Sequence, residues 1–172
     1  MTVRNLTDSN AYWSDSLAAE LLRFLTGRIK CPDIAAELTH DTYLGLRRVV
    51  EQQAPENTRA MAFRIAMNLA VDYQRKMMVR DRHTAEEAFD TIAETVACPT
   101  SSTERVLIGR ERLQALNGAL AELPLQCRTV FLLHGIEGLT YSQIAERLGI
   151  SKSLVNKLLA QAMHHCANRL AD

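Results

Sequence analysis

The chain has 172 residues, of which 47% are hydrophobic and 23% charged, and these are the proportions of an ordinary globular protein. Its 20 Lys and Arg residues balance its 20 Asp and Glu residues, and 7 Gly and 4 Pro without runs exclude collagen-like and low-complexity chains. No apolar stretch approaches the roughly 18 residues of a membrane span, and the start lacks the apolar core of a signal peptide. We therefore expect a cytoplasmic, mostly helical protein that is not inserted in a membrane.

In the first half of the chain, apolar residues recur with helical spacing. Pro32 suits the first turn of a helix, and either Asn57 or Thr58 is suited to cap another, after a loop over residues 52–58. This pattern predicts helices over residues 18–29, 33–50 and 59–78.

In the second half, the helical pattern resumes after a polar stretch and is interrupted at Pro124. It predicts helices over residues 104–123, 125–135, 140–148 and 152–169. We therefore predict an all-α fold of two small helical domains, residues 1–82 and 105–172, joined by a polar linker over residues 83–104.

The charge is unevenly distributed along the chain. Residues 1–58 carry a net charge of −2, residues 59–82 of +4, residues 83–122 of −4 and residues 123–172 of +2. Two basic segments separated by an acidic one are typical of a chain that contacts a polyanion at two places. Random scatter of solvated charges explains the same pattern equally well.

The residues that would indicate metal or catalytic chemistry are dispersed. No two of the four cysteines have CxxC spacing, and the adjacent His164, His165 and Cys166 point about 100° apart on a helix. The sequence has no clustered carboxylates, nucleophile elbow or phosphate-binding glycine loop. We expect reduced, packed thiols, no metal, no cofactor and no enzymatic activity.

The most specific pattern is a helix-turn-helix motif over residues 140–159. Ala145 is the small residue needed where two helices cross, and Gly149, four positions later, tolerates the positive φ of the turn. Val155 and Leu158 are expected to face the first helix, and Ser151 is a good N-cap for the second. A plain helical hairpin is the alternative, but the exposed Lys, Ser and Asn residues favour DNA binding.

Two parts of the sequence resemble one protein family. Residues 123–133, Leu-Pro-Leu-Gln-Cys-Arg-Thr-Val-Phe-Leu-Leu, and residues 137–151 resemble region 4 of sigma factors of the extracytoplasmic-function type. Residues 34–47 resemble region 2.2 of that family, and residues 59–76 resemble regions 2.3–2.4. The similarity covers residues 15–82 and 105–170 in the family's order, and the linker replaces region 3, which this group lacks.

A narrower resemblance points to the iron-responsive, ferric-citrate-type subgroup. It rests on Cys31-Pro32 and on the ending Ala162-Met-His-His-Cys166. The resemblance implies a dissociable subunit of bacterial RNA polymerase that directs the enzyme to a small set of promoters. It also implies control by an anti-sigma factor, anchored in the inner membrane in this subgroup.

The resemblance assigns roles to three sets of residues. The polymerase clamp coiled coil would be bound by Glu37, Leu38, His40, Asp41 and Tyr43, although Leu38 and Tyr43 could instead be core residues. The −10 promoter element would be bound by Arg59, Arg64, Asn68, Asp72, Arg75 and Lys76. The −35 element would be bound by Arg147, Ser151, Lys152, Ser153, Asn156, Lys157 and Gln161.

The sequence departs from the family pattern at three of its positions. His40 replaces the usual Gln, Met61 stands where an aromatic residue is frequent, and Leu154 replaces a frequent Thr. Phe63, close to the loop that captures a flipped base in this family, is expected to be a core residue rather than a base-stacking platform. The polymerase flap would hold a surface near Val130, Phe131 and Leu133.

One function of another class fits the same motif. A conventional helix-turn-helix regulator would dimerise and bind a palindromic operator without being a polymerase subunit. Dependence on polymerase separates the two hypotheses, because a sigma-factor domain of modest charge is expected to bind duplex DNA weakly when alone.

Overall fold

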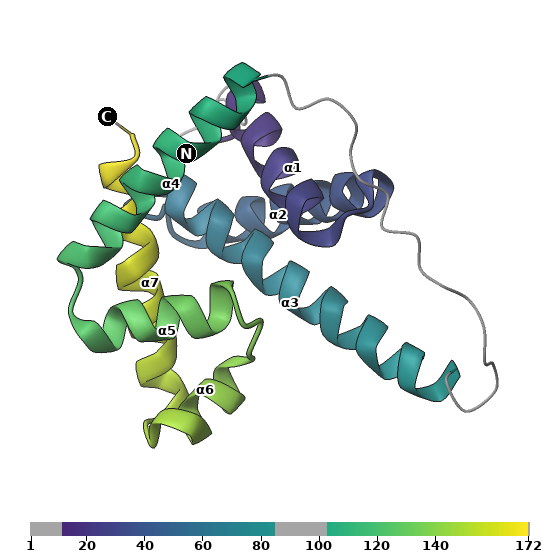
Figure 1. Cartoon of the computed structure of the whole chain (residues 1–172), viewed down its shortest axis with the longest axis vertical. Helices are drawn as coiled ribbons and strands as arrows, with labels where there is room; N and C mark the ends of the chain where they lie inside the picture. Colours follow the sequence, from purple (N-terminus) through teal and green to yellow (C-terminus); the bar gives the residue numbers. More distant parts are fainter. Residues whose placement is uncertain (1–11, 85–102, 172) are drawn as a thin grey trace, which may run out of the picture. The chain divides into compact units, whose positions relative to one another are not determined.

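The computed structural model describes residues 12–84 and 103–171, which form seven α-helices and no strand within these ranges. The predicted all-α class is therefore confirmed for this part of the chain. None of the helices in it is both long and apolar enough to cross a membrane. The described helices are drawn in Figure 1. The chain divides into two compact units, with the boundary between Ala70 and Val71.

The second and third helices begin within one residue of their predicted starts, and the first begins at Asp15 rather than at the predicted residue 18. Helix α1 spans Asp15–Ile29, α2 spans Pro32–Gln52 and α3 begins at Thr58. Pro32 occupies the first turn of α2, as predicted. Of the two candidate caps of α3, Asn57 serves, because its Oδ1 accepts the N–H of Ala60 at 2.8 Å.

The first unit is held by close contacts among these three helices. Leu21, Leu25 and Leu46 are fully buried. Helices α2 and α3 approach so closely at Gly45 that a Cβ atom there would lie 3.1 Å from Cγ2 of Ile65. The absence of a side chain at position 45 therefore leaves room for the side chain of Ile65.

Helix α3 is longer than predicted. It ends at Thr84, whereas the periodicity of the sequence indicated an end near Met78. The added turns carry polar and charged residues, which an exposed helix can hold without an apolar stripe. Most of the predicted linker, residues 85–102, lies outside the described residues, and the predicted domain bounds stay a prediction.

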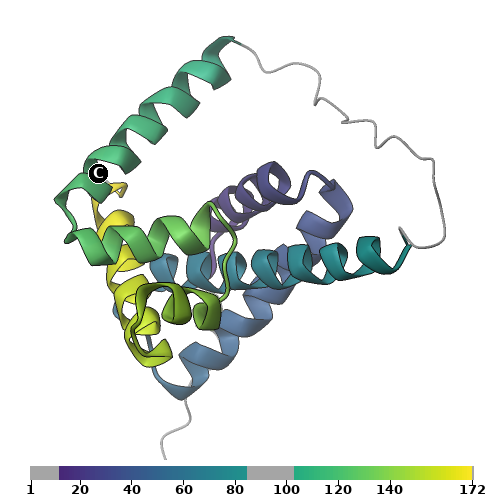
Figure 2. The same cartoon turned by 60° about the horizontal axis from the view of Figure 1, so that its bottom comes forward.

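The remaining helices pack around α7. Helix α4 spans Thr103–Glu122, α5 Leu125–Gly135, α6 Tyr141–Leu148 and α7 Lys152–Arg169. Helices α4, α5 and α6 each contact α7, and α5 also contacts α6 (Figure 2). The buried residues of α7 lie along one face and are Val155, Leu159, Ala162, Met163, Cys166 and Ala167.

The close approach at Gly45 predicts different effects for one substitution at two glycines. Gly45→Leu should lower the free energy of unfolding by about 1–3 kcal/mol, because the added atoms overlap Ile65. Gly27→Leu in α1 is the matched control, because no atom lies within 4 Å of a Cβ there. Urea unfolding followed by circular dichroism measures both, and equal losses would contradict the assigned role of Gly45.

Candidate functional site

The turn between α6 and α7 has the geometry that the sequence predicted. Gly149 has a φ of 65°, in the left-handed region that favours glycine. The N–H of Ile150 donates to the carbonyl of Ala145 at 3.0 Å, and the N–H of Gly149 donates to the carbonyl of Glu146 at 3.3 Å. These two hydrogen bonds form a Schellman motif, which ends α6 at a defined residue and directs the chain into α7.

Side-chain caps fix the beginning of both helices. Thr140 and Gln143 form a capping box at α6, in which each side chain accepts the other's backbone N–H, at 3.3 Å and 2.9 Å. Ser151 caps α7 as predicted, and its Oγ accepts the N–H of Leu154 at 3.1 Å. The start of α7 is therefore held at a fixed place relative to α6.

The core of the motif differs from the prediction at one position. Ile144 and Val155 are fully buried, as expected. Leu158, predicted to face the first helix, is only half-buried, and Leu159 is the fully buried residue. The reason is that α7 also packs on α5, and the thiol of Cys127 on α5 donates to the carbonyl of Leu158 at 3.1 Å.

The seven residues assigned to −35 recognition are all exposed. They offer two amines, one guanidinium, two hydroxyls and two amides, groups that can bind phosphate oxygens and base edges. They lie on α6, on α7 and at the cap between these helices, and are Arg147, Ser151, Lys152, Ser153, Asn156, Lys157 and Gln161. The apolar core therefore leaves a polar face of α7 available to a groove.

One of these residues has a partner that the sequence did not indicate. Nη1 of Arg147 donates to Oε2 of Glu137 at 2.7 Å, and both side chains are about half exposed. A guanidinium carries five N–H donors, so Arg147 retains donors for a phosphate while Glu137 orients it. Glu137 lies ten positions earlier in a turn, where no helical spacing links it to Arg147.

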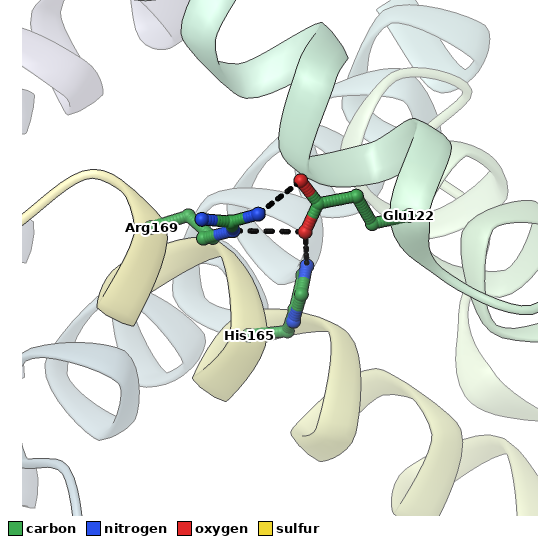
Figure 3. Close-up of polar contacts among 3 residues, drawn as sticks. All are labelled: Glu122, His165 and Arg169. Atoms are coloured by element: carbon green, nitrogen blue, oxygen red, sulfur yellow. Dashed lines mark hydrogen bonds and ion pairs between the residues drawn. The ribbon is translucent and has the colours of Figure 1, made fainter.

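A second cluster joins the ends of α4 and α7 (Figure 3). Both carboxylate oxygens of Glu122 accept N–H groups of Arg169, with Nε of Arg169 at 2.8 Å from Oε2. Nε2 of His165 lies 3.2 Å from the same Oε2 atom. The hydrogen bonds from Arg169 lower the pKa of Glu122 below its usual value. This cluster ties the C-terminal end of α7 to α4.

The residues assigned to −10 recognition do not all share one face of α3. Arg64, Asn68, Asp72 and Arg75 follow one another at helical spacing and form one stripe, with Lys76 beside it. Arg59 lies on the opposite face, where Nη2 is 2.7 Å from Oε2 of Glu20 on α1. In this structure Arg59 connects α3 to α1, and its assignment to the −10 element stays a prediction.

Phe63, expected to be a core residue, is half-buried and packs against another ring. Its ring meets that of Phe24 edge-on at a centroid distance of 5.5 Å, and the guanidinium of Arg59 lies 5.7 Å from its centroid. The neighbouring Met61 is half-buried. The loop between α2 and α3 comprises residues 53–57.

The residues assigned to polymerase binding divide into exposed and buried ones. Glu37, His40 and Asp41 are exposed on α2, and Tyr43 is half-buried. Leu38 is only 8% exposed and belongs to the core of the first unit, which favours packing over polymerase contact. Its assignment to polymerase binding stays a prediction. The ring of Tyr43 is covered in part by Tyr12 and Trp13, a contact that no local sequence pattern indicates.

The described cysteines are free thiols. Burial and, to a lesser extent, the neighbouring Cys127 together raise the pKa of Cys166 to about 11. Burial also raises the pKa of Cys127. Within residues 12–84 and 103–171, no group of three or more His, Cys, Asp or Glu side chains is placed to hold a metal ion.

Comparisons with known proteins find three kinds of similarity. Residues 113–166 match the family "Sigma-70, region 4". The ferric citrate uptake sigma factor FecI of Escherichia coli is 31% identical over 147 residues, which cover 85% of this chain and 82% of that protein. The ECF RNA polymerase sigma factor SigE of Mycolicibacterium smegmatis is 26% identical over 137 residues, 80% of this chain and 52% of that protein.

A solved structure is also similar to this chain. It is the sigma factor RpoE of Bartonella quintana in complex with the anti-sigma factor NepR. The identity is 20%, the TM-score is 0.34, and the match covers 91% of this chain and 92% of that one.

The Glu122 cluster predicts a pH-dependent contribution to stability. A carboxylate whose pKa is lowered by folding stabilises the protein above its unfolded pKa, and this contribution is lost as the pH falls. Glu122→Gln should therefore melt at a lower temperature than the wild type at pH 7, and the difference should close below pH 4.5, the ordinary value. Glu111→Gln, at an exposed position of the same helix, is the control. A difference in melting temperature that persists at low pH would contradict this role.

Proposed function

The chain belongs to the extracytoplasmic-function sigma factors, a family of transcription initiation factors, and we propose that it reads the two elements of its promoters with α7 and α3 and binds core RNA polymerase with α2. The observation that carries the proposal is the exposed polar face of α7, held on a buried apolar core and fixed by the Ser151 cap and the Gly149 turn. This arrangement supports insertion of a helix into a DNA major groove.

The −35 element is assigned to the N-terminal half of α7. Asn156 offers an amide, which can pair with a base edge through a donor and an acceptor. Lys152, Lys157 and Arg147 offer positive charge, which neutralises phosphates without reading sequence. The two kinds of group lie on one exposed face, so the same docking can supply both affinity and specificity.

The −10 element is assigned to the outer face of α3. Asp72, Arg75 and Lys76 are exposed there, and Arg64 and Asn68 are half-buried. The stripe combines cationic groups, which hold a nucleic-acid backbone, with an amide and a carboxylate, which can read bases. Arg59, also assigned to this element, pairs with Glu20 and so connects α3 to α1.

Core polymerase binding is assigned to the outer face of α2. Glu37, His40 and Asp41 supply a polar rim beside the ring of Tyr43. An aromatic centre with a polar surround is the usual composition of a protein interface. Leu38 contributes indirectly, because its buried side chain holds α2 in place in the first unit. Residues 1–82, 83–104 and 105–172 are the corresponding proposed domains.

Two further features of the proposal rest on the family relationship. The 31% identity to a ferric citrate uptake sigma factor supports promoters of iron-uptake genes as the targets. Membership of this group of sigma factors supports control by a membrane-anchored anti-sigma partner, with this chain acting in the cytoplasm.

Run-off transcription tests the proposed function. Purified core polymerase is incubated with genomic fragments of the source organism, with and without this protein. New start sites that share two short elements at a fixed spacing are the expected result, since two units must bind the elements together. The absence of new starts, combined with tight binding of the free protein to a palindromic duplex, would establish a conventional regulator instead.

Substitutions on α7 should separate base reading from phosphate binding. Asn156→Ala should reduce discrimination at one −35 base pair by about 1–3 kcal/mol, whereas Lys157→Ala should weaken all promoters alike and lower the salt dependence by about one phosphate contact. Competition transcription on a set of −35 variants measures the first effect, and a salt titration measures the second. An equal loss on all promoters with Asn156→Ala would show that it reads no base.

A further inference from the structure

An aromatic cluster lies on α2 beside the residues assigned to polymerase binding. Tyr12 stacks on Tyr43 with ring centroids 6.4 Å apart and planes 13° apart. Trp13 meets the same ring edge-on at 5.2 Å, and the His40 ring lies 6.2 Å away. The pKa of Tyr12 is raised by burial and by a side-chain hydrogen bond with Tyr43. We use the name aromatic cluster for the three rings of Tyr12, Trp13 and Tyr43.

The position of the aromatic cluster is fixed by the start of α1. Tyr12 and Trp13 directly precede Ser14, whose Oγ accepts the N–H of Leu17 at 3.1 Å and so caps α1. Helices α1 and α2 pack against each other. The cap therefore places both rings at one position on α2.

The aromatic cluster continues along an outward stripe of α2. His40, Tyr43, Arg47 and Glu51 follow one another at helical spacing, and Arg47 pairs with Glu51 at 3.5 Å. Glu37 and Asp41, both exposed, lie beside this stripe. The rings thus stand at the border of an acidic and polar surface, which is the surface already assigned to the polymerase.

The exposure of the three rings distinguishes them from core residues. Tyr12, Trp13 and Tyr43 are all half-buried, whereas the core beneath α2 consists of aliphatic and small side chains such as Ala35, Leu38 and Leu46. Rigid aromatic rings that are partly exposed lose little side-chain entropy on binding, and Trp and Tyr are the most frequent hot spots of interfaces. The chain has only one Trp, and it is placed here.

We propose that the aromatic cluster is the anchor of the polymerase-binding surface, so that Tyr12 and Trp13, which precede α1, contact core RNA polymerase together with Tyr43. The proposal rests on the proposed function and extends it to two residues outside the family's region 2.2. The expected partner surface is a helical one with basic groups, because the anchor is bordered by Glu37 and Asp41.

Affinity for core polymerase tests the aromatic cluster against a purely structural role. Trp13→Ala should weaken binding roughly 30-fold, the loss typical of a central aromatic anchor, while Trp13→Phe should retain most of the affinity. Phe24→Ala is the matched control, because Phe24 is also half-buried in an edge-to-face aromatic pair of the first unit, with Phe63. It should lower the melting temperature without a comparable loss of affinity. Equal losses of affinity for Trp13→Ala and Phe24→Ala, or none for Trp13→Ala, would overturn the proposal.

Hydroxyl-radical footprinting of the unaltered protein provides a second measurement, which does not depend on the folding of a variant. Oxidation of the peptide that contains Trp13 should fall several-fold when the protein is saturated with core polymerase. If the complex forms but the oxidation of this peptide is unchanged, the proposed role of the aromatic cluster is wrong, while the proposed function is not affected. Failure of the wild-type protein to bind core polymerase would instead overturn the proposed function, so the two failures are distinguishable.

Discussion

The packing of α7 against three other helices is the constraint on which the second unit depends. A single helix must bury one face against α4, α5 and α6 and still present another face to a partner. Its buried residues satisfy the first demand. The Ser151 cap fixes where the helix begins, and the contact of Arg169 with Glu122 holds its far end, which satisfies the second. Because the helix is fixed along its whole length, its exposed face is preorganised and costs little entropy to bind.

In the first unit the corresponding constraint is the use of small residues where helices contact each other. The buried face of α3 is built largely from small side chains, and α2 contributes Gly45 where the two helices meet. Small residues on such a face let helices pack with short interaxial distances. The buried alanines of α3 are Ala60, Ala62, Ala66 and Ala70.

Local signals made much of this fold predictable. The positive φ of Gly149, the cap by Ser151 and the first-turn place of Pro32 follow from chemistry within a few residues, and all three are confirmed. What the sequence could not supply is contact between distant residues. Arg59 pairs with Glu20 on another helix, and no local pattern of the sequence indicates this partner.

In the candidate sites too, local patterns were predictable and contacts between distant residues were not. Helical periodicity correctly placed the exposed residues of α7, because one apolar face determines the opposite one. Periodicity did not decide whether Leu38 packs in the core or contacts polymerase. The burial of a residue at the border of an apolar stripe depends on which other elements pack against it. The length of α3 beyond Met78 was missed for a related reason, because the added residues are mostly polar and charged and carry no apolar period.

The placement of Trp13 has a spectroscopic consequence. It is the only tryptophan, it belongs to the first unit, and its ring lies against a tyrosine. Tryptophan emission therefore reports the unfolding of one unit, whereas far-ultraviolet circular dichroism reports the helices of both. One denaturant titration followed by the two signals compares the stability of the first unit with that of the whole chain. Because Trp13 is an intrinsic probe, no fluorescent label has to be added.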